Sequence, residues 1–453
     1  FGNAVALSMD GTTLAVGAPG DDSGSAGVNQ PETTTPALPL AGAVHVYMRS
    51  ADGVWSRQAY LKASNSGQGD AFGTTLALSA DGNTLAVGAT GEDGSGKFVN
   101  SPTESDDSKD DSGAVYVFGR SATGAWSQQA YVKASNTRAG DSFGGSVALS
   151  SDGRTLAVGA PNERGDGANP DSNALLSAGA AYVYRRDGAG TWSFQKYLKA
   201  GNPHDFAKFG SAVALSGTGD ILAVGSVGED TFEVGSGGVF MFAHDGMAWS
   251  EQQLIKASNR AGGDLFGYAI ALSADGGTLA VGAPGEASKA TGVNNDKSND
   301  DLPAAGAVYV YVRGGAQWGQ ETYIKASNTG GFDQFGTSVH LSSDGSKLVV
   351  GAPTEDSAAQ GMGGVQGDDT AANTGAAYIF NRSGGDWLQQ SYVKASNNRR
   401  TGDPRFGSVA LSGDGKTVAV GAPREDGRST GIQGDQGAFG LSADFNAGAV
   451  YLY

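Results

Sequence analysis

One sequence pattern returns seven times along this chain of 453 residues. Its first copy runs from Phe1 to Pro19 and reads FGNAVALSMDGTTLAVGAP. Each copy begins with a Phe-Gly pair, at Phe1, Phe72, Phe143, Phe209, Phe266, Phe335 and Phe406. A motif that repeats at such a period is typical of a repeat architecture rather than of two or three unrelated domains. We therefore expect residues 1–453 to form a single domain of seven units.

The first half of each copy predicts a β-hairpin. In copy one, the apolar run Val5–Ser8 is followed by Asp10-Gly11 and by a second apolar run, Thr13–Gly17. Asp-Gly between two apolar runs indicates a tight turn in which both turn residues adopt positive φ. Pro19 then ends the second strand, because proline cannot donate to a β-ladder.

The second half of each copy predicts two further strands with larger side chains. In copy one, the third strand is Val44–Tyr47, and the fourth begins at Trp55 and ends near Lys62. Small residues on the first two strands and aromatic residues on the last two fit a wedge that is narrow at a central axis. We predict an all-β fold, a seven-bladed β-propeller of four-stranded antiparallel blades. The chain reaches Tyr453 on a third strand, so we expect the seventh blade to lack its outer strand.

Composition narrows the possible functions. The net charge of −17 disfavours nucleic acid as a partner and favours cations or basic ligands. The absence of cysteine excludes disulfides, zinc–thiolate sites and thiol catalysis. No apolar run approaches the ~18 residues of a membrane span, so we expect no direct insertion into a membrane. The chain begins at Phe rather than Met, and we expect it to be part of a longer protein.

The order Phe-Gly, apolar hairpin, Gly-Ala-Pro and Gly-Ala-Val-Tyr resembles the FG-GAP repeat of integrin α-chain propellers and of bacterial surface proteins. The resemblance spans the chain and implies a secreted or cell-surface location. It also implies an upper, ligand-binding face formed by the connections between strands two and three and between strands four and one. Integrin-type repeats often carry a calcium loop between strands one and two. Here that connection is only Ser8–Thr13, with the single carboxylate Asp10, so we expect plain turns there.

Acidic residues follow the Gly-Ala-Pro position in every copy and should form a ring on the upper face. They are Asp21, Asp22, Glu92, Asp93, Glu163, Glu229, Asp230, Glu286, Glu355, Asp356, Glu425 and Asp426. One interpretation is a ring that attracts a cation or a basic ligand. The other is that each carboxylate pairs with the recurring Lys-Ala-Ser-Asn segment as part of the scaffold.

A second recurrence lies in the long connections between strands two and three. Gly-Val-Asn or a related triplet is followed by further Asn and Asp residues, and the metal-ligand candidates are Asn294, Asp296, Asp368 and Asp435. Carboxylate and amide oxygens at this density could hold calcium, the one cofactor that the sequence suggests. Alternatively, the apolar residue anchors the loop and the polar residues make local turns.

Two further recurrences have structural interpretations. Asp70, Asp141, Asp264 and Asp333 stand two residues before a Phe-Gly pair, and we expect each to cap a turn by accepting backbone N–H bonds. The six tryptophans share one position in the repeat and are expected to pack between blades.

We therefore predict a binding or adhesion module without enzymatic activity. Its upper face would bind a protein or glycan ligand. Its contact loops would be 20–40, 91–112, 285–305, 354–374 and 424–447, with a notch at the short loop 228–236. A structural spacer within a larger surface protein is the main alternative. A carboxylate enzyme acting on glycans ranks below both, because a ring of similar acids shows no pair of carboxyls with different roles.

Overall fold

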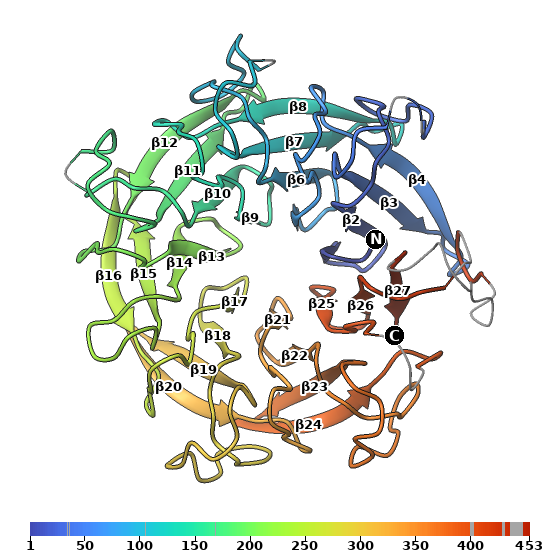
Figure 1. The fold of residues 1–453 in the computed structure, drawn as a ribbon, viewed down its shortest axis with the longest axis vertical. Helices are drawn as coiled ribbons and strands as arrows, with labels where there is room; N and C mark the ends of the chain where they lie inside the picture. The colour runs from blue at the N-terminus through green and yellow to red at the C-terminus, as the bar shows by residue number, and fades with distance from the viewer. Residues whose placement is uncertain are drawn as a thin grey trace.

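The structure is a computed structural model. It describes residues 1–33, 35, 37–104, 106–167, 169–398, 403–427, 431–434 and 447–453. Figure 1 shows small β-sheets arranged around a central axis, with the N- and C-termini close together. Six sheets have four strands and one has three, so the prediction of a seven-bladed propeller with an incomplete seventh blade is confirmed.

The blades follow the sequence repeats in order, and neighbouring strands within each blade are antiparallel. The strands of blades one to four are β1 (Val5–Leu7), β2 (Thr13–Ala18), β3 (Ala43–Arg49), β4 (Trp55–Leu61), β5 (Thr75–Leu78), β6 (Thr84–Ala89), β7 (Ala114–Arg120), β8 (Trp126–Val132), β9 (Ser146–Leu149), β10 (Thr155–Ala160), β11 (Ala180–Arg186), β12 (Trp192–Leu198), β13 (Phe209–Leu215), β14 (Ile221–Ser226), β15 (Gly238–His244) and β16 (Trp249–Ile255).

Blades five to seven repeat this arrangement until the last strand. Their strands are β17 (Ala269–Leu272), β18 (Thr278–Ala283), β19 (Ala307–Gly314), β20 (Gln317–Ile324), β21 (Ser338–Leu341), β22 (Lys347–Ala352), β23 (Ala376–Ser383), β24 (Asp386–Val393), β25 (Ser408–Leu411), β26 (Val418–Ala422) and β27 (Ala449–Leu452). None of the described residues forms a helix long and apolar enough to cross a membrane.

The turn between strands one and two differs from the prediction. In blade one, Gly11 has a φ of 66°, whereas Asp10 is not among the residues with positive φ. The Ser8–Thr13 pair closes a four-residue loop, and the Gly11 N–H donates to the Ser8 carbonyl. Such longer loops are built around a type I turn, which needs a left-handed residue only at its end. The prediction of positive φ at both residues was therefore wrong.

Contacts between glycines of neighbouring blades explain why the repeated motif has one glycine in its Phe-Gly pair and another in its second strand. The second-strand glycine of each blade lies against the carbonyl of the Phe-Gly glycine in the next blade, so that a Cβ there would collide with backbone. The pairs are Gly17 with Gly73, Gly88 with Gly144, Gly159 with Gly210, Gly225 with Gly267, Gly282 with Gly336, Gly351 with Gly407 and Gly421 with Gly2. The last pair joins blade seven to blade one in the same way as all other neighbours.

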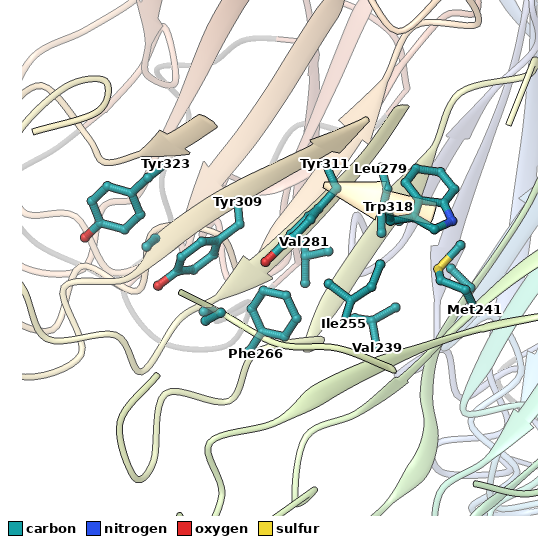
Figure 2. Packing of buried hydrophobic residues seen from close by; sticks show 14 of the residues in the cluster. Val239, Met241, Ile255, Phe266, Leu279, Val281, Tyr309, Tyr311, Trp318 and Tyr323 are labelled. Carbon is teal, nitrogen blue, oxygen red and sulfur yellow. The ribbon is translucent and has the colours of Figure 1, made fainter. Parts of the chain in front are cut away.

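The phenylalanine of the Phe-Gly pair is buried in blades two to seven, whereas Phe1 of blade one is half-buried. Phe266 contacts Tyr309 and Tyr311 edge to face at centroid distances of 5.3 and 6.1 Å. Figure 2 shows these rings beside Trp318 of β20 and Met241 of β15, in one buried cluster that includes both blades four and five. The Trp126 indole likewise donates to Gln58 of the preceding blade at 2.9 Å. The predicted packing of tryptophans between blades is confirmed at these positions.

A ring of backbone hydrogen bonds links the seven turns between strands one and two. Each N–H donates to a carbonyl in the next blade, at 2.8 to 3.0 Å. The bonds are Met9 to Ala80, Ala80 to Ser151, Ser151 to Gly217, Gly217 to Ala274, Ala274 to Ser343, Ser343 to Gly413, and Asp414 back to Met9. The ring therefore closes through main-chain groups even though one blade lacks a strand.

Replacing Gly351 with alanine tests the contact between blades. The new methyl group would meet the Gly407 carbonyl, a rigid backbone neighbour, so we expect Gly351→Ala to lower the free energy of unfolding by about 1–3 kcal/mol. A methyl group added at Gly20 would have no neighbouring atom within 4 Å, so Gly20→Ala is the matched control, with an expected change within about 0.5 kcal/mol. Urea unfolding measures both. Equal effects of the two substitutions would contradict the proposed role of the contact.

Candidate functional site: the upper rim

In blades one to six, the first acidic residue after the second strand forms an ion pair with the lysine at the end of the fourth strand of the same blade. Four of the six lysine side chains in these pairs are fully buried, and five of the six carboxylate side chains are at most 1% exposed. The pairs are Lys62–Asp21, Lys133–Glu92, Lys199–Glu163, Lys256–Glu229, Lys325–Glu286 and Lys394–Glu355. This is the scaffold arrangement that the sequence offered as one of two alternatives.

Blade two shows the complete polar network. Glu92 accepts hydrogen bonds from the Lys133 ammonium at 2.6 Å and from the Tyr131 hydroxyl at 2.7 Å. Asn65 of the preceding blade donates to the same carboxylate at 3.0 Å and accepts from the Tyr116 hydroxyl. Burial lowers the pKa of Lys133, and the adjacent Glu92 carboxylate opposes that shift. The glutamates of blades two to six therefore each tie two blades together, because their asparagine partners come from the preceding repeat, whereas no described asparagine donates to Asp21.

In blades one, two and six, a second acidic residue directly follows the first and fixes the long loop between strands two and three. Asp22, Asp93 and Asp356 accept backbone N–H bonds from Leu40, Asp111 and Asn373, near the far end of the same loop. These bonds measure 2.8 to 2.9 Å and bring the two ends of each loop together.

Blades four and seven depart from this pattern. Asp230, on the short loop of blade four, lies 3.2 Å from the imidazole of His204. Glu425 is 8% exposed and accepts from Asn397 at 2.8 Å and from the Gly427 N–H at 2.7 Å. Asp426 also has an interaction partner.

The metal-ligand candidates do not gather at one place. Asn294 accepts from the Tyr323 N–H at 2.9 Å, and Asp296 accepts from the Ser298 N–H at 2.9 Å. Asp368 lies on another blade and accepts from Thr370 at 2.5 Å. Asp435 falls outside the described residues. Within the described ranges, no group of three or more His, Asp or Glu residues is arranged to hold a metal ion.

An extra bridge lies on the outer edge of four blades. The valine of the Gly-Val-Asn triplet forms it in blades one and five, and Val99 and Met362 form it in blades two and six, whereas Val365 of the recurring triplet in blade six is exposed. The loop residue pairs antiparallel with the end of the fourth strand, as Val28 with Leu61, Val99 with Val132, Val293 with Ile324 and Met362 with Val393. In blades one, two and five, the following asparagine has a φ of 52–56° and its side chain accepts a backbone N–H from that strand. The apolar residue therefore anchors the loop, as the second sequence interpretation held. That interpretation missed the bridge, because pairing over ~30 residues leaves no local signal.

The aspartates before the Phe-Gly pairs are buried at the base of the rim. Asp70, Asp264 and Asp333 each accept a backbone N–H at 2.7 Å, which confirms the predicted turn capping at these three positions. Asp141 is fully buried, and its oxygens have no hydrogen-bond partner among the described residues. Burial raises the pKa of each of these four carboxyls to about 7.

Comparisons with known proteins agree with this geometry. A family model described as FG-GAP repeat matches residues 55–118, 126–184, 249–311 and 318–380, together more than half of the chain. No curated protein shows significant sequence similarity to it.

Two solved structures are similar to this chain at low identity. The periplasmic gluconolactonase PpgL of Pseudomonas aeruginosa is 15% identical, with a TM-score of 0.48, over 90% of this chain and 94% of that one. A protein from Lactobacillus plantarum is 13% identical, with a TM-score of 0.51, over 90% of this chain and 95% of that one. At these identities the likeness concerns the fold alone.

Breaking one buried ion pair tests whether the rim carboxylates act as scaffold. Lys394→Met leaves Glu355 buried without its cation, and we expect a loss of about 3–5 kcal/mol in the free energy of unfolding. Adding Glu355→Gln should restore part of this loss, since no charge is then left buried. Lys289→Met removes the exposed Lys289–Asp301 pair and is the control, with a much smaller expected change because solvent screens that pair. A small effect of Lys394→Met would contradict the scaffold role.

The raised pKa of Asp333 predicts a pH dependence. The folded state binds this proton more tightly than the unfolded chain, whose aspartates titrate near 3.9. The contribution of this carboxyl to the free energy of unfolding is therefore largest at low pH. It falls between about pH 4 and pH 7 and stays at the lower value above pH 7. We expect Asp333→Asn to gain stability relative to the wild type as pH rises from 5 to 8.

Urea unfolding at several pH values measures this difference. Asp52→Asn, which removes an exposed carboxylate, is measured in parallel as the control. If the difference in the free energy of unfolding between Asp333→Asn and the wild type does not change with pH, the raised pKa of the Asp333 carboxyl is contradicted.

Proposed function

Because the chain belongs to the FG-GAP repeat family, with the fold of a seven-bladed propeller, we propose that it is a binding module rather than an enzyme. Its contact surface would be the long loops between strands two and three on the upper face. The resemblance to integrin-type and bacterial surface propellers supports a secreted or cell-surface location.

This proposal rests on the observation that the acidic residues fall into a buried set and an exposed set. The carboxylates at the ends of the second strands are buried in ion pairs with lysine. The acids farther along the loops are exposed, among them Asp106, Asp107, Asp110, Asp111, Asp300, Asp301 and Asp369. The buried set fixes the loops. The exposed set, in which Asp301 pairs with Lys289 and Asp106 accepts from Ser95, lies in solvent on the loops, where a partner can reach it.

A protein with a basic surface is the partner that this chemistry favours. The exposed acids add to a net charge of −17, and complementary charge speeds association and suppresses wrong partners. A neutral glycan would gain less from the same loops, and nucleic acid would be repelled.

Calcium is not required in this proposal. The oxygens of Asn294 and Asp296 already accept backbone hydrogen bonds within their own blade. We therefore expect the melting temperature to be the same in calcium and in excess chelator, because only a ligand that binds the native state raises it. A thermal melt of the purified chain measures this. A rise with calcium would contradict the proposal and would direct attention to the acidic loops as a metal site.

Two other functions rank lower. A spacer would need only the scaffold and would leave the exposed loop acids without a role. A glycan-active enzyme needs two carboxyls at a set separation, one of them with a raised pKa. The aspartates whose pKa burial raises to about 7, such as Asp264 and Asp333, are buried.

A binding screen with a loop variant tests the proposed function. The chain is applied to protein and glycan arrays at low and high salt, beside a variant with Asp106, Asp107 and Asp110 changed to Asn. We expect a protein ligand whose binding weakens with salt and with the loop change. Gln252→Ala, on the outer edge of blade four, is the control and should bind normally. Blank arrays would favour the spacer, and binding that ignores the loop change would contradict the proposed surface.

A further inference from the structure

We propose that Asn136 and Lys199 become joined by an amide bond that cross-links blades two and three, in a reaction that the protein carries out on itself. The bond would form between the lysine Nζ and the asparagine Cγ, and ammonia would leave. It would lie in the interior of the propeller and would not depend on the binding function proposed above.

The Glu163 carboxylate contacts both reaction partners. One of its oxygens, Oε2, accepts from the Lys199 ammonium at 2.9 Å, and the other, Oε1, accepts from the Asn136 carboxamide at 2.8 Å. A carboxylate in this place can take a proton from the amine and give one to the leaving nitrogen. These are the two proton transfers that the replacement of one amide by another requires.

A hydroxyl group contacts the oxygen that would gain negative charge. The Tyr182 O–H donates to Asn136 Oδ1 at 2.7 Å, and a hydrogen-bond donor at this position stabilises the tetrahedral intermediate of acyl transfer. Asn136 Nδ2 also donates to the Pro170 carbonyl at 2.8 Å, so the carboxamide is held at both ends. Lys199 Nζ has a second acceptor as well, the Gly179 carbonyl at 2.6 Å.

The groups lie out of solvent. Asn136 is 2% exposed, Glu163 and Tyr182 are fully buried, and the Lys199 side chain is 5% exposed. Burial lowers the pKa of the Lys199 amine, and the Glu163 carboxylate opposes that shift. A buried lysine loses its proton more readily than one in water, and only the neutral amine is a nucleophile.

The reaction is a transamidation in which atoms and charges balance. The Lys199 ammonium gives one proton to Glu163, and the electron pair on Nζ attacks the Asn136 Cγ while the carbonyl electrons move to Oδ1. The Cγ–Nδ2 bond then breaks, and Nδ2 leaves as ammonia with the proton from Glu163 as the carbonyl re-forms. Nζ gives its extra proton to the Glu163 carboxylate. No oxidant, reductant or water is consumed, and the flexible lysine stem has only to bring Nζ to about 3–3.5 Å from Cγ.

The same contacts recur in three other blades. In each, the asparagine and the lysine donate to one carboxylate, at 2.8–3.0 Å and 2.6–2.7 Å, and a tyrosine hydroxyl donates to the asparagine. The sets are Asn65, Glu92, Lys133 and Tyr116; Asn259, Glu286, Lys325 and Tyr309; and Asn328, Glu355, Lys394 and Tyr378. Their asparagines are more exposed than Asn136, so we expect the bond to form first in blade three.

Blade four supplies an internal control. Asn202 and Lys256 both donate to Glu229, but Phe240 takes the place of Tyr182 on the third strand. No hydroxyl is therefore available at that place to stabilise the intermediate, and we expect Asn202 and Lys256 to stay unlinked.

Mass spectrometry of the purified full chain tests the cross-link. We expect the intact mass to fall by one ammonia for each bond formed, and a tryptic digest to contain a branched peptide that joins Asn136 to Lys199. Tyr182→Phe keeps the ring but removes the hydroxyl, and it should lower the linked fraction about tenfold or more at equal times. Glu163→Gln should abolish the link. Lys196→Arg, at an exposed position of β12, is the control and should leave the linked fraction unchanged.

Three results would overturn the proposal. The first is an intact mass equal to that of the unmodified sequence after prolonged incubation at neutral pH. The second is conversion of Asn136 to aspartate, which would mean that water rather than lysine reaches Cγ. The third is a linked fraction that neither Tyr182→Phe nor Glu163→Gln lowers. Where Glu163→Gln impairs folding, Tyr182→Phe decides, because blade four accommodates a phenylalanine at the same place.

Discussion

The contact between two glycines in neighbouring blades is the constraint on which the rest of the structure depends. The second-strand glycine of one blade lies against the carbonyl of the Phe-Gly glycine in the next, and no side chain fits between them. This contact sets the spacing of the blades near the axis. It also places each Phe-Gly phenylalanine under the third strand of its own blade, where it packs on aromatic rings such as Tyr309 and Tyr311. The two halves of the repeated motif are thus the two sides of one interface.

Farther from the axis, hydrogen bonds between polar side chains connect neighbouring blades. The Glu92 carboxylate binds lysine and tyrosine of its own blade and asparagine of the preceding one. A buried ion pair adds little net stability compared with apolar packing, because desolvation offsets much of the attraction. Its geometry is nevertheless specific, since a lysine displaced by one residue would leave the carboxylate unpaired. The network therefore determines how each long loop leaves the second strand.

The sequence predicted the features that local patterns encode. The Phe-Gly spacing indicated seven blades, and the gradation from small to aromatic residues indicated the order of strands from the axis outward. It did not predict the register shift between the third and fourth strands, such as that at Val46 and Tyr47, or the ring of bonds through Met9 and Asp414. These depend on residues that meet only after the blades assemble. The hairpin turn was misjudged for a different reason, because Asp-Gly fits both the shorter and the longer loop.

Departures from symmetry carry more functional information than the repeated groups themselves. Six copies of a carboxylate paired with lysine describe a scaffold, and their recurrence is explained once the pairing is seen. Glu425 has similar burial but another set of described partners, the Asn397 amide and the Gly427 N–H. Blades three and four differ in another way: no described residue of their long connections bridges to β12 or β16, whereas blades one, two, five and six have such a bridge. Comparing each blade with its neighbours thus separates the residues that hold this propeller together from those available to a partner.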